Sequence, residues 1–477
     1  MRTGFVVMLL LFILSAEARG ASREDTWMSV TLDGRKIGQM LNTRDVRGDR
    51  VITTQVLDVR IDRAGIGIGL VTSETSEESR DGKPLGFSAR SQLSGIETSL
   101  VGTISGKSVS VTSSVGGAST TKTQAWPEGA VLAEGLRLSA LQHGLAAGTE
   151  YSDIAFQPSS LDAIRATTRV VGTQIVDLPG GRKVLFRLDQ DLAIPGMPMQ
   201  SQAYVDAKQN IHKLVMTVLG QRMELLACSR ACAQAPNQPT DMLKQALLAA
   251  PRALDNGELQ HAMRYTVSAR DPAQPISIPG TDEQQVHSEG GQFRLDVSPQ
   301  ARPGGDPPVA ADRAANAWLQ SDAPEIVALA KQAAGDAGSD LQRMQQLETF
   351  VRGYIQDKNL SVGYASALEV AKTREGDCTE HALLLAALGR ALSIPTRVVD
   401  GLAYTGQFGG AQRVFVPHAW AQAWVDGRWQ SFDAALRGFD SGHIALGIGD
   451  GDPWRFFSGI ATLGNLKLEK IEIPARP

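Results

Sequence analysis

The sequence predicts an α+β protein with an N-terminal antiparallel β-domain, a meander or half-barrel, followed by a domain that mixes helices and strands. Between residues 27 and 226, short β-forming runs alternate apolar and polar side chains and are separated by turn dipeptides. Beyond Pro324, apolar residues recur every three or four positions, as they do on amphipathic helices. A chain of 477 residues has room for two or three domains, each with its own core.

The composition is typical of a globular protein, with 42% hydrophobic and 21% charged residues. The 47 Lys and Arg residues are outnumbered by 51 Asp and Glu residues, which gives a net charge of −4. This balance provides no positive field that would attract phosphate groups, so we expect no nucleic-acid partner. The chain has three cysteines, so at least one of them must lie outside any internal disulfide.

The N-terminus has the pattern of a signal peptide over residues 1–18. Arg2 precedes an apolar run at residues 5–14, and Ala16-Glu17-Ala18 is a small-x-small cleavage site. The run is shorter than the roughly 20 residues that a membrane span needs, so we expect no integral membrane span. We therefore expect export to the periplasm or the medium, where disulfides can form. A buried first helix is the less favoured interpretation.

Residues 19–232 form the predicted β-rich domain. Asp33-Gly34, Asp81-Gly82 and Gly180-Gly181 are hairpin signals between its strands. Its architecture resembles the lipoprotein carriers and related periplasmic β-folds. Near its end, Cys228 and Cys232 are spaced for a local disulfide with a structural role. A metal site is the alternative, but no other Cys or His lies close by in the sequence to complete it.

The rest of the chain divides into three segments. Residues 233–255 are predicted to form a linker and a short helix, and residues 256–314 are predicted to form β-strands with a Pro/Gly-rich connection. Residues 315–477 form the final domain, which begins with helical patterns at 324–334 and 341–355 and ends in strands.

Cys378 lies where a buried helix is predicted to begin. Residues 379–392 are mostly apolar helix formers, and Asp377 is a candidate cap. The free N–H groups and the dipole at a helix N-terminus stabilise a thiolate, which favours a reactive cysteine. The same N–H groups are suited to hold an oxyanion. The plainer interpretation is an inert buried thiol.

A histidine and an aspartate are predicted to meet on one face of a hairpin further along the chain. Asp426-Gly427 is a strong two-residue turn signal, which pairs Val425 with Arg428 and places Trp420 opposite Asp433. His418 lies two residues from Trp420 and therefore shares that face. With Cys378, the pair would supply the nucleophile, base and orienting acid of thiol acyl transfer.

Four motifs in this part of the chain carry a family resemblance. They are Gly-Asp-Cys-Thr-Glu-His-Ala at 376–382, Ile-Pro-Thr-Arg at 394–397, His-Ala-Trp at 418–420 and Trp-Gln-Ser-Phe-Asp at 429–433. Over residues 315–440 the sequence resembles the transglutaminase-like superfamily of papain-like thiol enzymes, in its exported bacterial branch. The resemblance implies that Cys378 is the nucleophile, His418 the general base and acid, and Asp433 the residue that fixes the imidazole. The family often continues with Asp-Pro-Thr where this chain has Asp433-Ala434-Ala435, which puts the local turn in doubt.

Several further residues are candidates for roles around the predicted nucleophile. Asn359 and Tyr364 are candidate oxyanion donors, Glu380 and His381 candidate supports behind the thiol, and Trp420 a candidate cleft wall. Glu380 is expected to pair with Arg397. His443, Asp450 and Asp452 occur in a glycine-rich stretch that we interpret as a solvated turn rather than a calcium site, so no metal or cofactor is assigned.

The leading hypothesis is an exported thiol enzyme that acts on a protein or peptide of the cell envelope. A Cys378 thioester would pass its acyl group to water, as in a peptidase or amidase, or to an amine, as in a transamidase. The alternative is a non-catalytic binding or assembly module that uses the same fold as a scaffold. The residues leave open the natural substrate, the acceptor, a need for calcium and the oligomeric state.

Overall fold

The computed structural model describes residues 22–474 except 64–65, 94–95, 116–117, 195–198, 219–220, 241–245, 273–275, 301, 303, 359–363 and 453–462. The predicted signal peptide and Asn359 lie outside the described residues. The chain divides into two compact units, residues 1–62 with 67–240 and residues 63–66 with 241–477.

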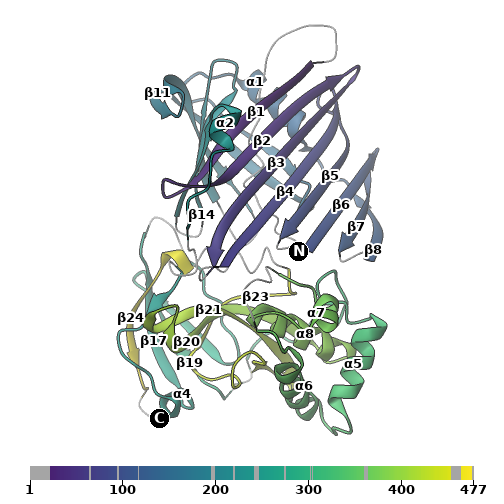
Figure 1. Ribbon diagram of the computed structural model, residues 1–477, viewed down its shortest axis with the longest axis vertical. Helices are drawn as coiled ribbons and strands as arrows, with labels where there is room; N and C mark the ends of the chain where they lie inside the picture. Colours follow the sequence, from purple (N-terminus) through teal and green to yellow (C-terminus); the bar gives the residue numbers. More distant parts are fainter. Residues whose placement is uncertain are drawn as a thin grey trace. The chain divides into compact units, whose positions relative to one another are not determined.

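The first unit contains one large sheet, which confirms the predicted N-terminal antiparallel sheet (Figure 1). Within the described residues it has 15 strands in the order β8-β7-β6-β5-β4-β3-β2-β1-β15-β14-β13-β12-β11-β10-β9. Their bounds are β1 Ser22–Leu32, β2 Arg35–Arg47, β3 Arg50–Arg63, β4 Ile66–Ser79, β5 Pro84–Leu93, β6 Ile96–Ser105, β7 Ser108–Val115, β8 Ala118–Ala125, β9 Ala130–Val131, β10 Glu150–Gln157, β11 Asp162–Leu178, β12 Gly181–Leu192, β13 Met199–Val205, β14 Ile211–Val218 and β15 Gln221–Ala227.

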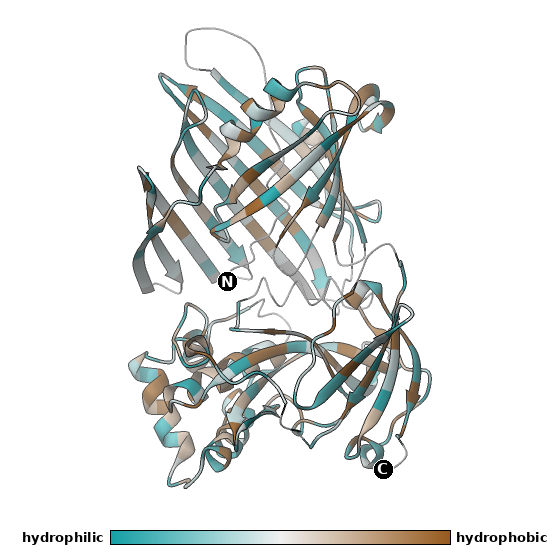
Figure 2. Cartoon of the chain, turned by 180° about the vertical axis from the view of Figure 1, so that it is seen from behind, coloured by the Kyte–Doolittle hydropathy of each residue, from teal (hydrophilic) through white to brown (hydrophobic). Residues whose placement is uncertain are grey.

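The strands of this sheet follow each other as a meander because tight turns join them. Asp33 and Gly34 both have positive φ, 47° and 78°, which is the backbone of a hairpin turn between β1 and β2. Leu178 pairs with Gly181, so the turn between β11 and β12 lies one residue earlier than the Gly180-Gly181 signal indicated. Figure 2 shows hydrophobic and hydrophilic residues alternating along the strands. The period-two pattern of the sequence therefore arises because successive side chains point to opposite faces of the sheet.

Two short helices accompany the large sheet. Helix α1 (Ala133–His143) begins against the Glu78 side chain, whose carboxylate accepts the backbone N–H groups of Glu134 at 2.6 Å and Gly135 at 2.9 Å. Helix α2 (Arg230–Ala233) follows β15, and Cys228 and Cys232 form a disulfide across its start with their Cα atoms 5.9 Å apart.

The second unit places helices on an antiparallel sheet (Figure 1). The sheet has the order β16-β21-β20-β23, and β22 also pairs with β21. A second sheet of the described residues has the order β18-β19-β17-β24. The strands are β16 Leu248–Ala249, β17 Met263–Ala269, β18 Gln284–Glu289, β19 Gln292–Val297, β20 Thr396–Phe408, β21 Ala411–Val425, β22 Arg428–Phe432, β23 His443–Gly449 and β24 Leu466–Glu472. The helical elements are α4 Asn256–Leu259, η2 Ala310–Asp312, α5 Pro324–Ala334, α6 Asp340–Tyr354, α7 Ala367–Thr373 and α8 Cys378–Ala391.

Helix α8 is the centre of the helical layer. It is buried along most of its length and packs against β20 and β21, while α5, α6 and α7 pack around it. A separate apolar core joins the two sheets, with Tyr265 of β17 and Phe415 of β21 meeting edge to face at 5.7 Å. The helix that begins at Cys378 is therefore held directly against the strand that carries His418.

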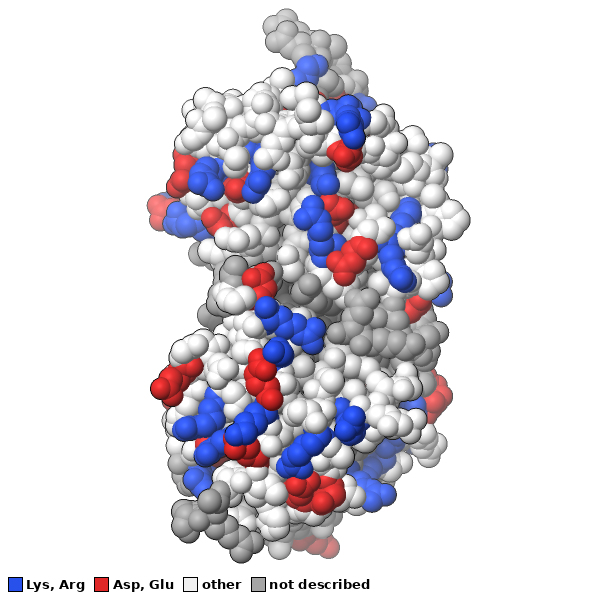
Figure 3. All heavy atoms as spheres, turned by 90° about the vertical axis from the view of Figure 1, so that its left-hand side faces the viewer, with Lys and Arg blue, Asp and Glu red and all other residues white. Residues whose placement is uncertain are grey.

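In the described part of the chain, no helix is both long and apolar enough to cross a membrane. In the view of Figure 3, the basic and acidic side chains of the described residues lie interspersed.

Candidate active site

Cys378 is the first residue of helix α8, and a network of caps fixes that position. Asp377 accepts the backbone N–H of Thr379 at 2.9 Å, and the Glu380 carboxylate accepts the backbone N–H of Asp377 at 2.9 Å. Glu380 also accepts the backbone N–H of Ala365 at 2.9 Å, which ties the helix start to the segment before α7. Cys378 is partly buried and does not belong to the disulfide. The predicted helix start at the cysteine is confirmed.

Glu380 and His381, which follow Cys378 in helix α8, are buried, and burial favours the neutral form of each. Burial, reinforced by the nearby Asp377, raises the pKa of Glu380 well above its usual range. Burial also lowers the pKa of His381. The Nδ1 of His381 lies 2.6 Å from the carbonyl oxygen of Asp377, which fixes the tautomer with the proton on Nδ1. Both side chains thus stabilise the helix start. The Glu380 side chain accepts hydrogen bonds from backbone N–H groups rather than pairing with a cation.

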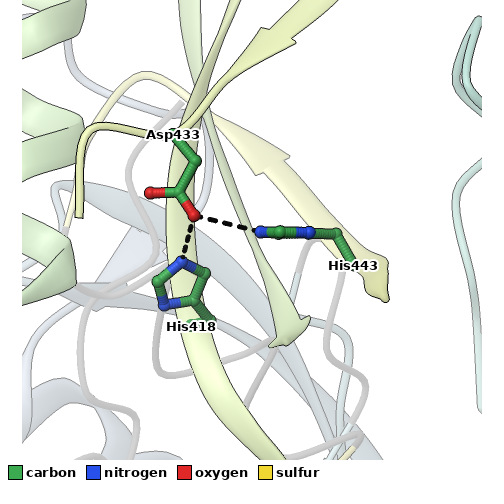
Figure 4. A group of neighbouring side chains, drawn as sticks. All are labelled: His418, Asp433 and His443. Atoms are coloured by element: carbon green, nitrogen blue, oxygen red, sulfur yellow. Dashed lines mark hydrogen bonds and ion pairs between the residues drawn. The ribbon is translucent and has the colours of Figure 1, made fainter. Parts of the chain in front are cut away.

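The hairpin that carries His418 has the predicted register. Asp426 and Gly427 have φ values of 52° and 73°, and Val425 pairs with Arg428, followed by pairs up to Ala421 with Phe432. Extended beyond Phe432, this register places Asp433 on the same face of the hairpin as His418. The two side chains meet, with the Nε2 of His418 2.9 Å from the Oδ2 of Asp433 (Figure 4).

The Asp433 carboxylate remains ionised although it is almost fully buried. Burial acts to raise its pKa, but the charges and hydrogen bonds of His418 and His443 outweigh burial and hold the pKa far below its usual range. A negative charge at this point orients the His418 ring.

Helix α6 holds the backbone of Asp433. Glu348 accepts the Asp433 backbone N–H at 2.8 Å, and Arg352 donates to the Asp433 carbonyl oxygen at 3.0 Å. The Oδ1 of Asp433 accepts the backbone N–H groups of Ala435 at 2.8 Å and Leu436 at 3.1 Å. The departure from Asp-Pro-Thr therefore leaves a well-formed turn after the carboxylate.

Along the edge of β22 that faces away from β21, three side-chain carboxylates accept backbone N–H groups. They take the place of the carbonyl oxygens that a neighbouring strand would supply. Trp429 donates its backbone N–H to Asp282 at 2.7 Å, Ser431 donates to Glu283 at 2.7 Å, and Asp433 donates to Glu348. An edge strand otherwise exposes every second N–H. Burial raises the pKa of Glu283 to about 7. None of the three acids is predicted from the sequence, because their partners are backbone groups, which belong to no sequence motif.

A second histidine also reaches the Asp433 carboxylate. The Nε2 of His443, the first residue of β23, lies 3.0 Å from the same Oδ2 that His418 contacts, and Figure 4 shows the two rings approaching it from different directions. His443 is only 2% exposed, so its interpretation as part of a solvated turn was wrong. Burial opposes protonation of His443, but hydrogen bonds to Asp433 and Asp440 raise its pKa overall.

The same three side chains contain a possible donor set for a metal. His418, Asp433 and His443 each offer one ligand atom, and these atoms lie within 4.8 Å of one another. Two imidazoles and a carboxylate suit zinc or iron. However, the two imidazoles lie 2.9 and 3.0 Å from the carboxylate, which are the distances of N–H hydrogen bonds. Because these hydrogen bonds already satisfy the carboxylate, we assign no metal.

The remaining predicted residues bond elsewhere. The Tyr364 hydroxyl donates to the carbonyl oxygen of Gly451 at 2.8 Å, and the Trp420 indole N–H donates to the Ser431 hydroxyl at 3.0 Å. The expected pair of Glu380 with Arg397 was wrong. Arg397 donates instead to Gln422 at 2.8 and 3.0 Å and stacks over the Trp429 ring, because β21 and β22 place those groups beside it.

Comparison with known proteins identifies the domain that carries these residues. Residues 327–434 match the profile of the transglutaminase-like superfamily, so the second unit contains a transglutaminase-like domain. No curated protein matches the chain.

Solved structures resemble parts of the chain at low identity. One is a "putative cysteine protease" of Cytophaga hutchinsonii, 17% identical over 45% of this chain and 85% of its own, with a TM-score of 0.28. Another is a β-barrel-like protein of a domain of unknown function from Brucella abortus, 14% identical over 45% of this chain and 98% of its own, with a TM-score of 0.35. A "putative protease" of Parabacteroides distasonis is 10% identical over 74% of this chain and 68% of its own, with a TM-score of 0.20.

Proposed function

We propose that the protein is a thiol enzyme that transfers an acyl group from an amide through a thioester on Cys378. The observation that carries the proposal is the buried His418–Asp433 pair, joined at 2.9 Å, on a strand that packs against the helix beginning at Cys378. A helix N-terminus favours the thiolate, and a buried carboxylate favours the imidazolium, so the two elements supply the two halves of a thiolate–imidazolium pair.

The reaction divides the work between the three side chains. The Nε2 of His418 is engaged by Asp433, which leaves Nδ1 to take the thiol proton of Cys378. The sulfur then attacks the amide carbonyl carbon, and a C–S bond forms as the C=O becomes an oxyanion. Collapse breaks the C–N bond, and His418 returns the proton to the leaving amine. Water or a second amine, deprotonated by His418, attacks the thioester and releases the thiol.

The setting that we propose is the cell envelope. Residues 1–18 have the pattern of a signal peptide, and Cys228 and Cys232 form a disulfide, which persists in oxidising compartments. A protein or peptide of the envelope is accordingly the proposed substrate. Mass measurement of the protein after expression in a bacterium tests the export, because cleavage after Ala18 leaves a chain that begins at Arg19.

Trapping the acyl-enzyme tests the reaction. The mature protein is incubated with an envelope extract, quenched in acid and examined by peptide mass spectrometry for an acyl adduct on Cys378. A parallel incubation with a glutamine-containing peptide and a labelled amine separates hydrolysis from amine transfer. We expect an adduct on the wild-type protein that is absent from Cys378→Ala and much reduced in His418→Ala. An unmodified Cys378 under all these conditions would instead favour the scaffold alternative.

A further inference from the structure

We propose that His443 is a positioning residue of the thiol site, whose Nε2–H holds the Asp433 carboxylate in the orientation that His418 needs. This inference rests on the proposed function and deepens it. His443 lies beyond the segment that matches the superfamily, which ends at residue 434. None of the four sequence motifs includes it.

The carboxylate of Asp433 is held by four donors, two on each oxygen. Its Oδ1 accepts from the backbone of Ala435 and Leu436, and its Oδ2 accepts from His418 at 2.9 Å and His443 at 3.0 Å. A carboxylate oxygen has two lone pairs, so these donors use its full capacity. The plane of the carboxylate is thereby fixed, and His418 meets an acceptor that cannot rotate away.

The fold supplies His443 across one intervening strand. In strand β20, Gly401 pairs with His418 of β21, and Ala403 pairs with His443 of β23. Residues 401 and 403 point to the same face of β20, so both histidines lie on that face. Gly401 has no room for a side chain, since a Cβ there would lie 2.0 Å from the carbonyl oxygen of Ile444 and 3.0 Å from the Trp420 ring. The glycine therefore keeps the space between the two strands clear.

The surroundings of His443 fix which nitrogen carries the proton. Its Nδ1 lies 3.1 Å from both the carbonyl oxygen and the Oδ1 of Asp440, and the backbone N–H of Asp440 points at Nδ1 from 3.3 Å. A neutral ring accepts that N–H at Nδ1, whereas a charged ring donates from Nδ1 to an Asp440 oxygen. In both states Nε2 is protonated and faces Asp433. The Phe439 ring at 4.9 Å and the Trp420 ring at 5.2 Å enclose the imidazole.

Sharing one oxygen between two histidines has a consequence for the thiol. Without the His443 donor, the Asp433 carboxylate would be held by its Oδ1 contacts and His418 alone and could turn, so His418 would lose its fixed acceptor. The titratable groups that bear on His443 are His418, Asp433, Asp440 and Glu283. Loss of the His443 donor should therefore weaken the thiolate–imidazolium pair and move the rise of Cys378 labelling to higher pH.

The test compares His443→Phe, which fills the apolar enclosure without a donor, with His443→Gln, whose amide can replace Nε2–H. The rate of iodoacetamide alkylation at Cys378 is measured against pH for both variants and the wild type. We expect the midpoint of the rising labelling profile to move up by about one pH unit in His443→Phe and to stay near the wild-type position in His443→Gln. A general loss of packing would change the rate at every pH without moving the midpoint.

Two outcomes would overturn the inference. A folded His443→Phe protein with the wild-type profile would show that the donor is irrelevant, and a His443→Gln profile displaced like that of His443→Phe would show that a donor is not what the site needs. Low-field imidazole N–H resonances provide a second measurement on the wild type, since His443→Gln should remove one of two such signals. A wild-type midpoint at the ordinary thiol value of about 8.5 would contradict the proposed function itself, while the resonances would still report the contact between His443 and Asp433.

Discussion

Glu348 accepts the backbone N–H of Asp433 at 2.8 Å, so one turn of helix α6 fixes the residue that orients His418. Arg352, one turn further along α6, donates to the carbonyl oxygen of the same residue at 3.0 Å. Both backbone groups of Asp433 are therefore held by one rigid element, although Asp433 itself lies just beyond the end of strand β22. A site that must hold its geometry closely gains from support of this kind.

Replacing Glu348 should disturb the site without touching any reacting group. Glu348→Ala leaves a buried N–H without an acceptor, which should lower the free energy of unfolding by about 1–3 kcal/mol. We also expect alkylation of Cys378 to slow several-fold, because Asp433 is no longer anchored. Glu348→Gln keeps an acceptor oxygen and should have the smaller effect on both. Urea denaturation and the alkylation rate check the two expectations.

A matched control for this prediction is Glu325→Ala, which removes an exposed carboxylate from the first turn of helix α5. It should change the free energy of unfolding by no more than about 0.5 kcal/mol. If Glu348→Ala behaved like Glu325→Ala in both measurements, the anchoring role of α6 would be wrong.

Gly376, two residues before the thiol, should tolerate no side chain. Its φ is 149°, and a Cβ there would lie 2.3 Å from the Cβ of Glu380, which forms the capping box. Gly376→Ala should therefore destabilise the protein by about 2 kcal/mol or more. Gly353→Ala is the control, because a Cβ at this exposed position of α6 meets nothing within 4 Å. That control should stabilise the helix by about 0.5–1 kcal/mol. Equal thermal unfolding curves for the two variants would contradict the capping account.

Glu283 should make the stability of the protein fall as the pH rises from about 4.5 to about 7. Its folded-state pKa is about 7 because of burial, whereas its ordinary value is 4.5, so the folded state binds an extra proton in this window. The free energy of unfolding should decline there by up to about 1.4 kcal/mol per pH unit. Glu283→Gln should flatten that slope, as followed by urea denaturation across the window. The exposed Glu289→Gln should retain it, and parallel curves for both variants would rule out the raised pKa of Glu283.

The sequence predicted the parts of the site that depend on local rules. Asp426-Gly427 determines the register of the hairpin, and period two then places His418 and Asp433 on one face. Asp377 and Glu380 form a capping box, which explains why the helix begins at Cys378. Each of these inferences needs only a few neighbouring residues.

The parts that the sequence did not reveal depend on contacts between distant segments. His443 reaches Asp433 through the pairing of β23 with β20, and its glycine-rich surroundings in the sequence resemble a loop. The alternation of Ile444, Leu446 and Ile448 with smaller residues is a strand signal in this stretch. Glu380 and Arg397 looked complementary in charge, but the buried carboxylate serves backbone N–H groups instead. Charge alone does not identify partners when backbone donors also compete for them.

The most direct test of the central claim is the pH dependence of Cys378 alkylation by iodoacetamide in the wild type, His418→Ala and Asp433→Asn. If the three side chains act together, the wild-type thiol is labelled rapidly near pH 6, while His418→Ala is labelled slowly until the pH approaches the ordinary thiol value of about 8.5. Asp433→Asn should fall between the two, because His418 loses the charge that stabilises its imidazolium. Three superimposable profiles with a midpoint near pH 8.5 would contradict the account.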